Sequence, residues 1–144
     1  MKAKEYLQQL HKADVIIRQR VQEKADLRAR LSSIGSFDYS KERVQTSLSG
    51  GAGYEREIIK IVDLENEIDR LIDDYIGLKH KVIGQLHDLN DTNQIKILYK
   101  RYVLGEKFEQ IAVDMNFSIR NVYKIHGHAL QEFQKIRMEK QSVQ

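Results

Sequence analysis

Four side chains in the last third of the chain have types and spacing that suit recognition of double-stranded DNA. They are Arg120, Asn121, Tyr123 and Lys124. An Arg side chain can offer two donors to guanine, and an Asn side chain can pair with the N6/N7 edge of adenine. Lys and Tyr can reach bases or phosphates, and such contacts normally lie at the start of a helix that enters the major groove. We therefore predict that these four residues contact DNA bases.

Basic side chains near this set would contact DNA phosphates, which supply affinity without sequence information. The candidates are Lys96, Lys100, Arg101 and Lys107. Residues 92–144 carry 9 Lys and Arg against 5 Asp and Glu, a net charge of +4. That balance is compatible with a nucleic-acid partner but does not by itself require one.

Other clusters of reactive side chains give no comparable signal. His126 and His128 lie two positions apart, and residues with that spacing do not face each other on a helix. The acidic stripe of Glu65, Asp69 and Asp73 is more typical of a solvated helix face than of a cation site. The sequence also lacks a phosphate-binding glycine loop, a zinc-protease His pair and a Gly-x-Ser-x-Gly elbow. We expect no enzymatic activity, catalytic residue, metal, cofactor or small-molecule substrate.

Three short helices are expected to position the DNA-contacting set. They span residues 92–103, 106–115 and 118–136. Gly105 can end the first, because it can adopt the left-handed conformation, and Ser118 is a natural N-cap for the third. Small Ala112 would let the second and third helices approach closely, as a helix-turn-helix requires. The inner faces carry Ile97, Leu98, Tyr102, Phe108, Ile111, Ala112, Met115, Val122, Ile125, Ala129, Leu130 and Phe133.

Two long helices are expected before this domain. The first covers residues 1–34 and is helical from residue 3, with apolar residues mostly at three- and four-residue steps. The second covers residues 54–91 and is helical to about residue 89. Between them, residues 35–53 contain several Gly and Ser residues, which do not favour a helix. We interpret that segment as a flexible linker.

The second long helix carries an apolar seam with near-heptad spacing. Its members are Ile58, Ile61, Leu64, Ile68, Leu71, Tyr75, Leu78, Val82 and Leu86. A seam of this length must pack against another helix, and the sequence leaves two partners open. One is the first long helix, folded back antiparallel, and the other is the same stretch, 58–86, in a homodimer. The basic first helix and the acidic second helix favour the hairpin.

Composition limits the compartment in which the protein works. The chain contains no Cys, so disulfides and thiolate metal sites are excluded. No apolar run approaches the length of about 18 residues that a membrane helix needs. The N-terminus runs straight into amphipathic sequence, without the apolar run of a signal peptide. We expect a cytoplasmic protein of a bacterial host cell, with no membrane partner.

Residues 97–133 resemble region four of housekeeping-type sigma factors, the helix-turn-helix that reads the −35 promoter element. The resemblance lies in Ile-Leu-Tyr-Lys-Arg-Tyr-Val-Leu-Gly, Phe-Glu-Gln-Ile-Ala, Ser-Ile-Arg-Asn-Val-Tyr and His-Ala-Leu. Over its full length the chain is similar to phage regulators of the ArpU and RinA type. These pair a helical N-terminal half with a domain of this kind and are implicated in late-gene or autolysin transcription.

The resemblance implies base contacts at the four residues that open this section, and to the phosphate contacts we add Ser118 and His128. The chain departs from the family pattern at three positions. Lys107 stands where the family usually has a capping Ser or Thr, and Gln110 replaces a common Glu. His128 replaces a usual Arg or Lys, so one fixed positive charge is lost and DNA affinity would depend on pH. No segment resembles the sigma regions that open promoters.

The sequence thus predicts an all-α protein, with a long helical hairpin or coiled coil followed by a small helix-turn-helix domain over residues 92–144. The expected function is sequence-specific regulation of transcription, as an activator of phage or prophage late genes that binds promoter DNA. A contact with host RNA polymerase is implied by the resemblance alone. Two alternatives remain open: a small terminase-like packaging protein, and a helical protein–protein adaptor that does not bind DNA.

Overall fold

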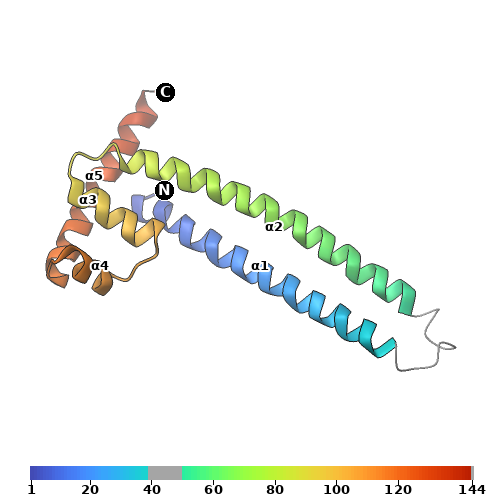
Figure 1. Cartoon of the computed structure of the whole chain (residues 1–144). Coiled ribbons are helices and arrows are strands. Elements are labelled where there is room, and N and C mark those ends of the chain that lie inside the picture. Colours follow the sequence, from blue (N-terminus) through green and yellow to red (C-terminus); the bar gives the residue numbers. More distant parts are fainter. Residues whose placement is uncertain (39–49, 144) are drawn as a thin grey trace. The chain divides into compact units, whose positions relative to one another are not determined.

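The computed structural model describes residues 1–38 and 50–143, and helices are the regular structure in those ranges, as the all-α prediction requires. The helices are α1 (Ala3–Asp38), α2 (Gly50–Leu86), α3 (Thr92–Leu98), the π-helix η1 (Tyr99–Val103), α4 (Phe108–Met115) and α5 (Ile119–Ser142) (Figure 1). No helix in these ranges is long and apolar enough to cross a membrane.

The chain divides into two compact units. Unit 1 consists of Met1–Asp14 and Tyr75–Gln144, and unit 2 consists of Val15–Asp74. Helices α1 and α2 each contribute residues to both units, whereas α3, η1, α4 and α5 belong to unit 1 alone.

Unit 2 is an antiparallel pair of helical segments from α1 and α2, which lie side by side (Figure 1). Ion pairs join Arg20 to Glu67 and Arg28 to Glu65, so the residue numbers rise along one helix as they fall along the other. The seam residues Ile61, Leu64 and Ile68 are buried within this unit. Here the seam packs within one chain, as the hairpin alternative proposed. A homodimer through residues 58–86 stays a prediction, and in this unit it would have to displace α1 from the seam.

The long helices extend further into the predicted linker than the sequence pattern indicated, whereas α2 ends at Leu86 rather than at about residue 89. Helix α1 ends at Asp38 rather than at residue 34, and α2 begins at Gly50 rather than at residue 54. Both margins of the predicted linker are therefore helical, while its residues 39–49 lie outside the described residues. Gly costs least at a helix start, where the first N–H groups have no intrahelical partner in any case. The long helix that follows can therefore tolerate a glycine-rich first turn.

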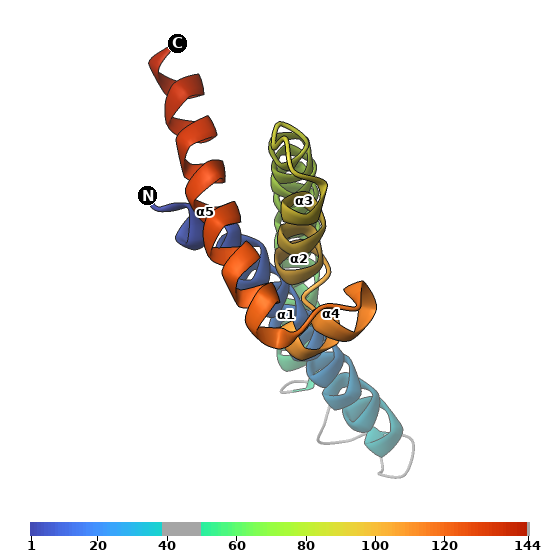
Figure 2. The same cartoon turned by 90° about the vertical axis from the view of Figure 1, so that its left-hand side faces the viewer.

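The core of unit 1 has two clusters of buried apolar residues. The first cluster consists of Ala3, Tyr6, Leu7, Leu10, Val82, Leu86, Leu89, Leu98, Tyr102, Val103, Ala129 and Phe133. The second cluster consists of Ile97, Ile111, Ala112 and Val122. The predicted inner faces of the C-terminal helices supply much of both clusters, and Figure 2 shows the short α4 beside the first turns of α5.

A pair of substitutions in α2 tests the packing of unit 2. Leu64 is 6% exposed and Ile59 is 58% exposed. Replacing Leu64 with Ala should lower the free energy of unfolding by about 2–5 kcal/mol, because a buried side chain is lost and a cavity remains. Replacing Ile59 with Ala should change it by less than about 0.5 kcal/mol, as is usual at surface positions. Urea unfolding monitored by far-UV circular dichroism measures both changes in the free energy of unfolding. Equal losses for the two variants would contradict this packing.

Candidate functional site at the start of helix α5

A three-residue turn places α5 against α4. Asn116 ends α4 in the left-handed conformation, with φ 57° and ψ 43°, which Asn tolerates better than most residues. The Phe117 backbone N–H then donates to the Ala112 carbonyl at 2.9 Å, and the Phe117 side chain packs on the second cluster. The Ser118 hydroxyl oxygen accepts a hydrogen bond from the Asn121 backbone N–H at 3.1 Å. The predicted N-cap at Ser118 is thus confirmed.

The rotation of α5 about its own axis is set by Val122, which is fully buried in the second cluster. Arg120 and Lys124, on either side of it in sequence, are exposed and lie one turn apart on the outward side. Tyr123 is 50% exposed, and Asn121 is half-buried at the flank. The structure therefore brings all four predicted base-contacting residues into the first two turns of α5.

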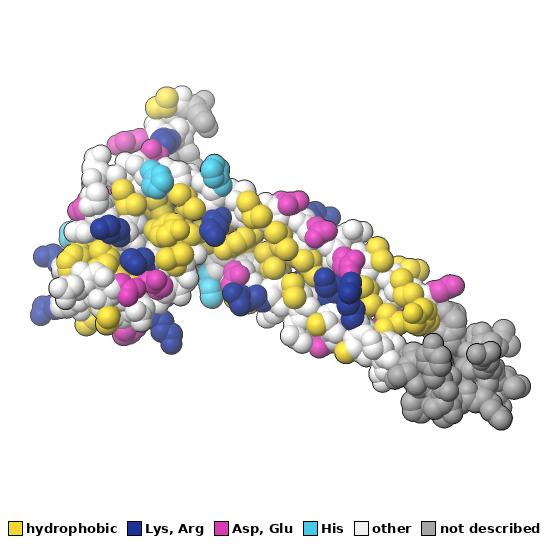
Figure 3. Space-filling view, in the orientation of Figure 1, with side chains coloured by type: hydrophobic (Ala, Val, Ile, Leu, Met, Phe, Trp, Pro, Cys, Tyr) yellow, Lys and Arg dark blue, Asp and Glu magenta, His cyan; other side chains and the backbone are white. Residues whose placement is uncertain are grey.

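The charge of this outward side is positive. Residues 119–131 contain no Asp or Glu, and the first turn of α5 has no acidic residue. Figure 3 shows Lys and Arg side chains around α4 and the turns that adjoin it, with Asp and Glu side chains among them. A helix N-terminus also carries partial positive charge from its unpaired N–H groups, which adds to the positive potential at this position.

The predicted phosphate contacts fall into two groups. Lys96, Lys107, Ser118 and His128 are exposed, and Lys107 stands at the N-cap position of α4 without making a side-chain cap, as expected from its chemistry. Lys100 and Arg101 are half-buried instead, and both side chains are engaged within the chain. These intramolecular interactions distinguish Lys100 and Arg101 from the exposed group.

Lys100 and Arg101 connect η1 to the segment that leads into α4. The Lys100 Nζ atom lies 3.9 Å from a Glu106 carboxylate oxygen and 3.7 Å from one of Asp114. The Arg101 guanidinium donates to the Glu106 carbonyl oxygen at 3.1 Å and lies 4.4 Å from the centroid of the Phe108 ring. Any phosphate contact from either residue would compete with these interactions, whereas no ion pair or hydrogen bond within the described residues engages the side chains of Lys96 and Lys107.

An aromatic cluster supports the inner side of the site. The Phe108 ring centroid lies 5.0 Å from that of Tyr123 and 4.9 Å from that of His126. Tyr102 stacks on His126 at 5.8 Å, and its hydroxyl lies 2.8 Å from His126 Nε2. The cluster therefore holds Tyr123, a predicted base contact, through Phe108. This role of His126 was not predicted from the sequence, although its position four residues after inward-facing Val122 indicates an inner location.

Burial keeps His126 neutral. Desolvation by burial, together with smaller effects from the positive charges of Arg101 and Lys4, lowers the pKa of His126 from 6.5 to about 4. Burial likewise raises the pKa of Tyr102, with a smaller opposing effect from Arg101. Because a neutral imidazole has one nitrogen without a proton, the Tyr102 hydroxyl can donate to Nε2. Protonation of His126 would remove that acceptor and bury a charge.

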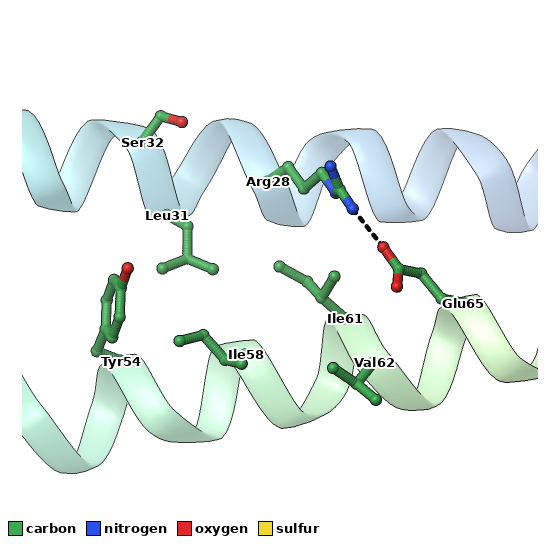
Figure 4. A pocket seen from close by; sticks show the side chains of 8 residues that line it. All are labelled: Arg28, Leu31, Ser32, Tyr54, Ile58, Ile61, Val62 and Glu65. Carbon is green, nitrogen blue, oxygen red and sulfur yellow. Dashed lines mark hydrogen bonds and ion pairs between the residues drawn. The ribbon is translucent and has the colours of Figure 1, made fainter.

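Unit 2 contains a separate hollow of about 530 Å³ between α1 and α2. Apolar side chains line much of it, and the Arg28–Glu65 ion pair spans the two helices at one end (Figure 4). The lining residues are Arg28, Leu31, Ser32, Tyr54, Ile58, Ile61, Val62 and Glu65. Across residues 1–38 and 50–143, no group of three or more His, Asp or Glu side chains gathers as metal ligands would.

Comparison with known proteins gives no match to a family model, to a curated protein or to a solved structure. Inference about function therefore depends on the site itself and on the resemblance of its sequence pattern.

The pH dependence of stability tests the state of His126. Because its pKa in the folded chain, about 4, lies below the ordinary value of 6.5, the unfolded chain binds the proton more readily between those values. The free energy of unfolding should therefore be greatest above pH 6.5 and should fall as the pH drops towards 4. His126→Gln should remove this part of the loss in unfolding experiments across that range. His87→Gln, at an exposed position, should retain it. Identical pH profiles for wild type and His126→Gln would contradict the assignment.

Proposed function

We propose that α4, the turn and α5 form a helix-turn-helix that binds double-stranded DNA with sequence preference, and that the protein regulates transcription through it. The observation that carries the proposal is the orientation of α5. Val122 is buried while Arg120 and Lys124 point outward from a face without acidic residues. A helix that presents Arg and Lys at its first turns suits a major groove, which is wide enough to admit an α-helix and presents bases with distinct donor and acceptor patterns.

The local contacts hold the DNA-facing residues in the first two turns of α5 in fixed positions. Buried Ala112 on α4 and buried Val122 on α5 belong to one cluster, so a small residue stands where the two helices approach. The cap at Ser118 and the contact of Phe108 with Tyr123 fix the first two turns of α5. Base recognition needs side chains held in place before DNA arrives, because ordering them on binding costs conformational entropy.

The predicted DNA contacts divide the proposed work between them. Arg120, Asn121, Tyr123 and Lys124 would read bases. Lys96, Lys107, Ser118 and His128 would contact phosphates, which fix the register of the protein on the duplex. The structure engages Lys100 and Arg101 elsewhere in unit 1, so we assign them a supporting role in holding η1 and the approach to α4.

The regulatory part of the proposal draws on the resemblance of residues 97–133 to sigma region four. We propose an activator of phage or prophage late genes that acts at promoters, in the cytoplasm of a bacterial host. Because the domain resembles a promoter-reading module without the regions that open promoters, its output would require a partner such as RNA polymerase.

DNA binding and the role of Arg120 are tested together. Sites are first selected from random duplexes, and affinities are then measured by fluorescence anisotropy at several salt concentrations. Binding should weaken linearly in a plot of log K against log salt concentration, because phosphate contacts release counterions. Arg120→Ala should cost about 1–3 kcal/mol on the selected site and relax the preference at one base pair.

Arg30→Ala is the matched control, because Arg30 is also an exposed Arg on a helix but belongs to unit 2. It should leave the base preference unchanged. An equal loss on all sequences for Arg120→Ala would reduce Arg120 to a phosphate contact. No binding by wild type even at low salt would contradict the proposal and favour the adaptor alternative.

Gly127 provides a test in which stability and affinity should move in opposite directions. It is exposed on the same side of α5 as Arg120 and Lys124, and a Cβ added there would meet nothing within 4 Å. Gly127→Ala should therefore raise the stability of the free protein by up to about 1 kcal/mol, because Ala is the better helix former. It should weaken DNA binding, because the added methyl group would separate the helix from the groove.

Gly84→Ala is the control, since Gly84 is also an exposed helical glycine with open space around a Cβ. It should give a similar gain in stability without a change in affinity. Thermal unfolding and anisotropy report the two quantities. If Gly127→Ala leaves affinity unchanged, the interface is confined to residues nearer the N-terminus of α5.

A further inference from the structure

Ile119, the first residue of α5, exposes an apolar side chain beside the predicted base-contacting set. It is 38% exposed, and it belongs to neither buried cluster of unit 1 nor to the partly buried residues packed on them. Arg120 follows it directly and Tyr123 and Lys124 lie in the next turn, and all three are exposed. Ile119 is not among the contacts predicted from the sequence, because those were polar side chains.

The start of α5 does not require an Ile at this position. The cap of α5 is the Ser118 hydroxyl, and Phe117, just before it, packs on the cluster that contains Val122. That pairing is the hydrophobic staple expected of a helix start, so no apolar residue is needed at the position that follows the cap. A β-branched residue is also a weaker helix former than Ala or Leu. The exposed part of the Ile119 side chain is therefore available to a partner.

The position of Ile119 limits the chemistry of that partner. Residues four apart lie on one side of a helix, so Ile119 and Tyr123 form a row next to the row of Arg120 and Lys124. The apolar row borders the residues proposed to read bases. In the major groove of unmodified DNA, the apolar group at a base edge is the C5-methyl group of thymine.

We propose that Ile119 recognises the C5-methyl group of a thymine in the binding site. This inference rests on the proposed DNA-binding function and adds a specificity-determining residue to it. It assigns an A·T base pair at one fixed step from the base pair read by Arg120. The contact contributes to specificity because cytosine lacks the methyl group in unmodified DNA and the purines present other edges.

Replacing thymine with uracil tests the proposal, because uracil keeps every hydrogen-bonding group of thymine and lacks only the methyl group. Each thymine of the selected duplex is replaced in turn with deoxyuridine, and the affinity of the wild-type protein is measured by anisotropy. Burial of one methyl group is worth about 0.8 kcal/mol, so one position should show an affinity loss of about fourfold.

Ile119→Ala should bind the thymine duplex more weakly and should bind the thymine and uracil duplexes equally at that position. Ala is the better helix former, and thermal unfolding checks that the variant folds. Val113→Ala is the matched control, because Val113 is a 75% exposed apolar residue on α4. It should retain the fourfold difference.

The outcomes separate the two proposals. If wild type binds no duplex at low salt, the proposed function fails and this inference fails with it. If wild type binds the selected site but no uracil substitution weakens binding, only the inference fails. It is likewise overturned if Ile119→Ala keeps the fourfold difference, or if Tyr123→Ala abolishes it while Ile119→Ala does not.

Discussion

The burial of Val122 among Ile97, Ile111 and Ala112 is the contact on which the functional face depends. One fully buried residue near the start of a helix fixes which side of that helix faces the solvent. With Val122 inward, Arg120 and Lys124 must point outward, and Gly127 follows on the same side. A rotation of α5 by one residue, about 100°, would bring a charged or polar side chain into an apolar cluster, which costs several kcal/mol when it is unpaired.

The contacts around η1 determine which basic side chains remain available to contact DNA. The π-helix inserts one residue relative to α-helical spacing, and a backbone bond from Leu104 N–H to the Tyr99 carbonyl, 3.1 Å long, marks it. Lys100 then lies near the carboxylates of Glu106 and Asp114, and Tyr102 meets His126. From the sequence alone, the charge of Lys100 would be assigned to DNA binding. In the structure it instead forms ion pairs that hold η1 to α4 and to the segment before it.

Residue types and short-range spacing in the sequence predicted the helix caps and the buried faces of the C-terminal helices. The cap at Ser118, the left-handed Gly105 with φ 72°, and the inward row from Val122 to Phe133 follow from residue type and spacing alone, and the structure confirms them. Contacts between residues that are far apart in the sequence could not be predicted in this way. The π-turn, the ion pairs of Lys100 and the Tyr102–His126 contact require the register between helices. The helical ends at residues 35–38 and 50–53 were missed because glycine content was weighed without the long helices that adjoin them.

The length of helix α5 allows it to contact two separate parts of unit 1. It runs without interruption from Ile119 to Ser142, and beyond the second cluster it reaches the start of α1. There the Phe133 ring lies 6.2 Å from that of Tyr6, and the Arg137 guanidinium lies 3.8 Å from the centroid of the same Tyr6 ring. From Arg120 to Phe133 the helix spans about 20 Å at its usual rise per residue. One uninterrupted helix therefore joins the contacts with Tyr6 to the outward residues of its first two turns within unit 1.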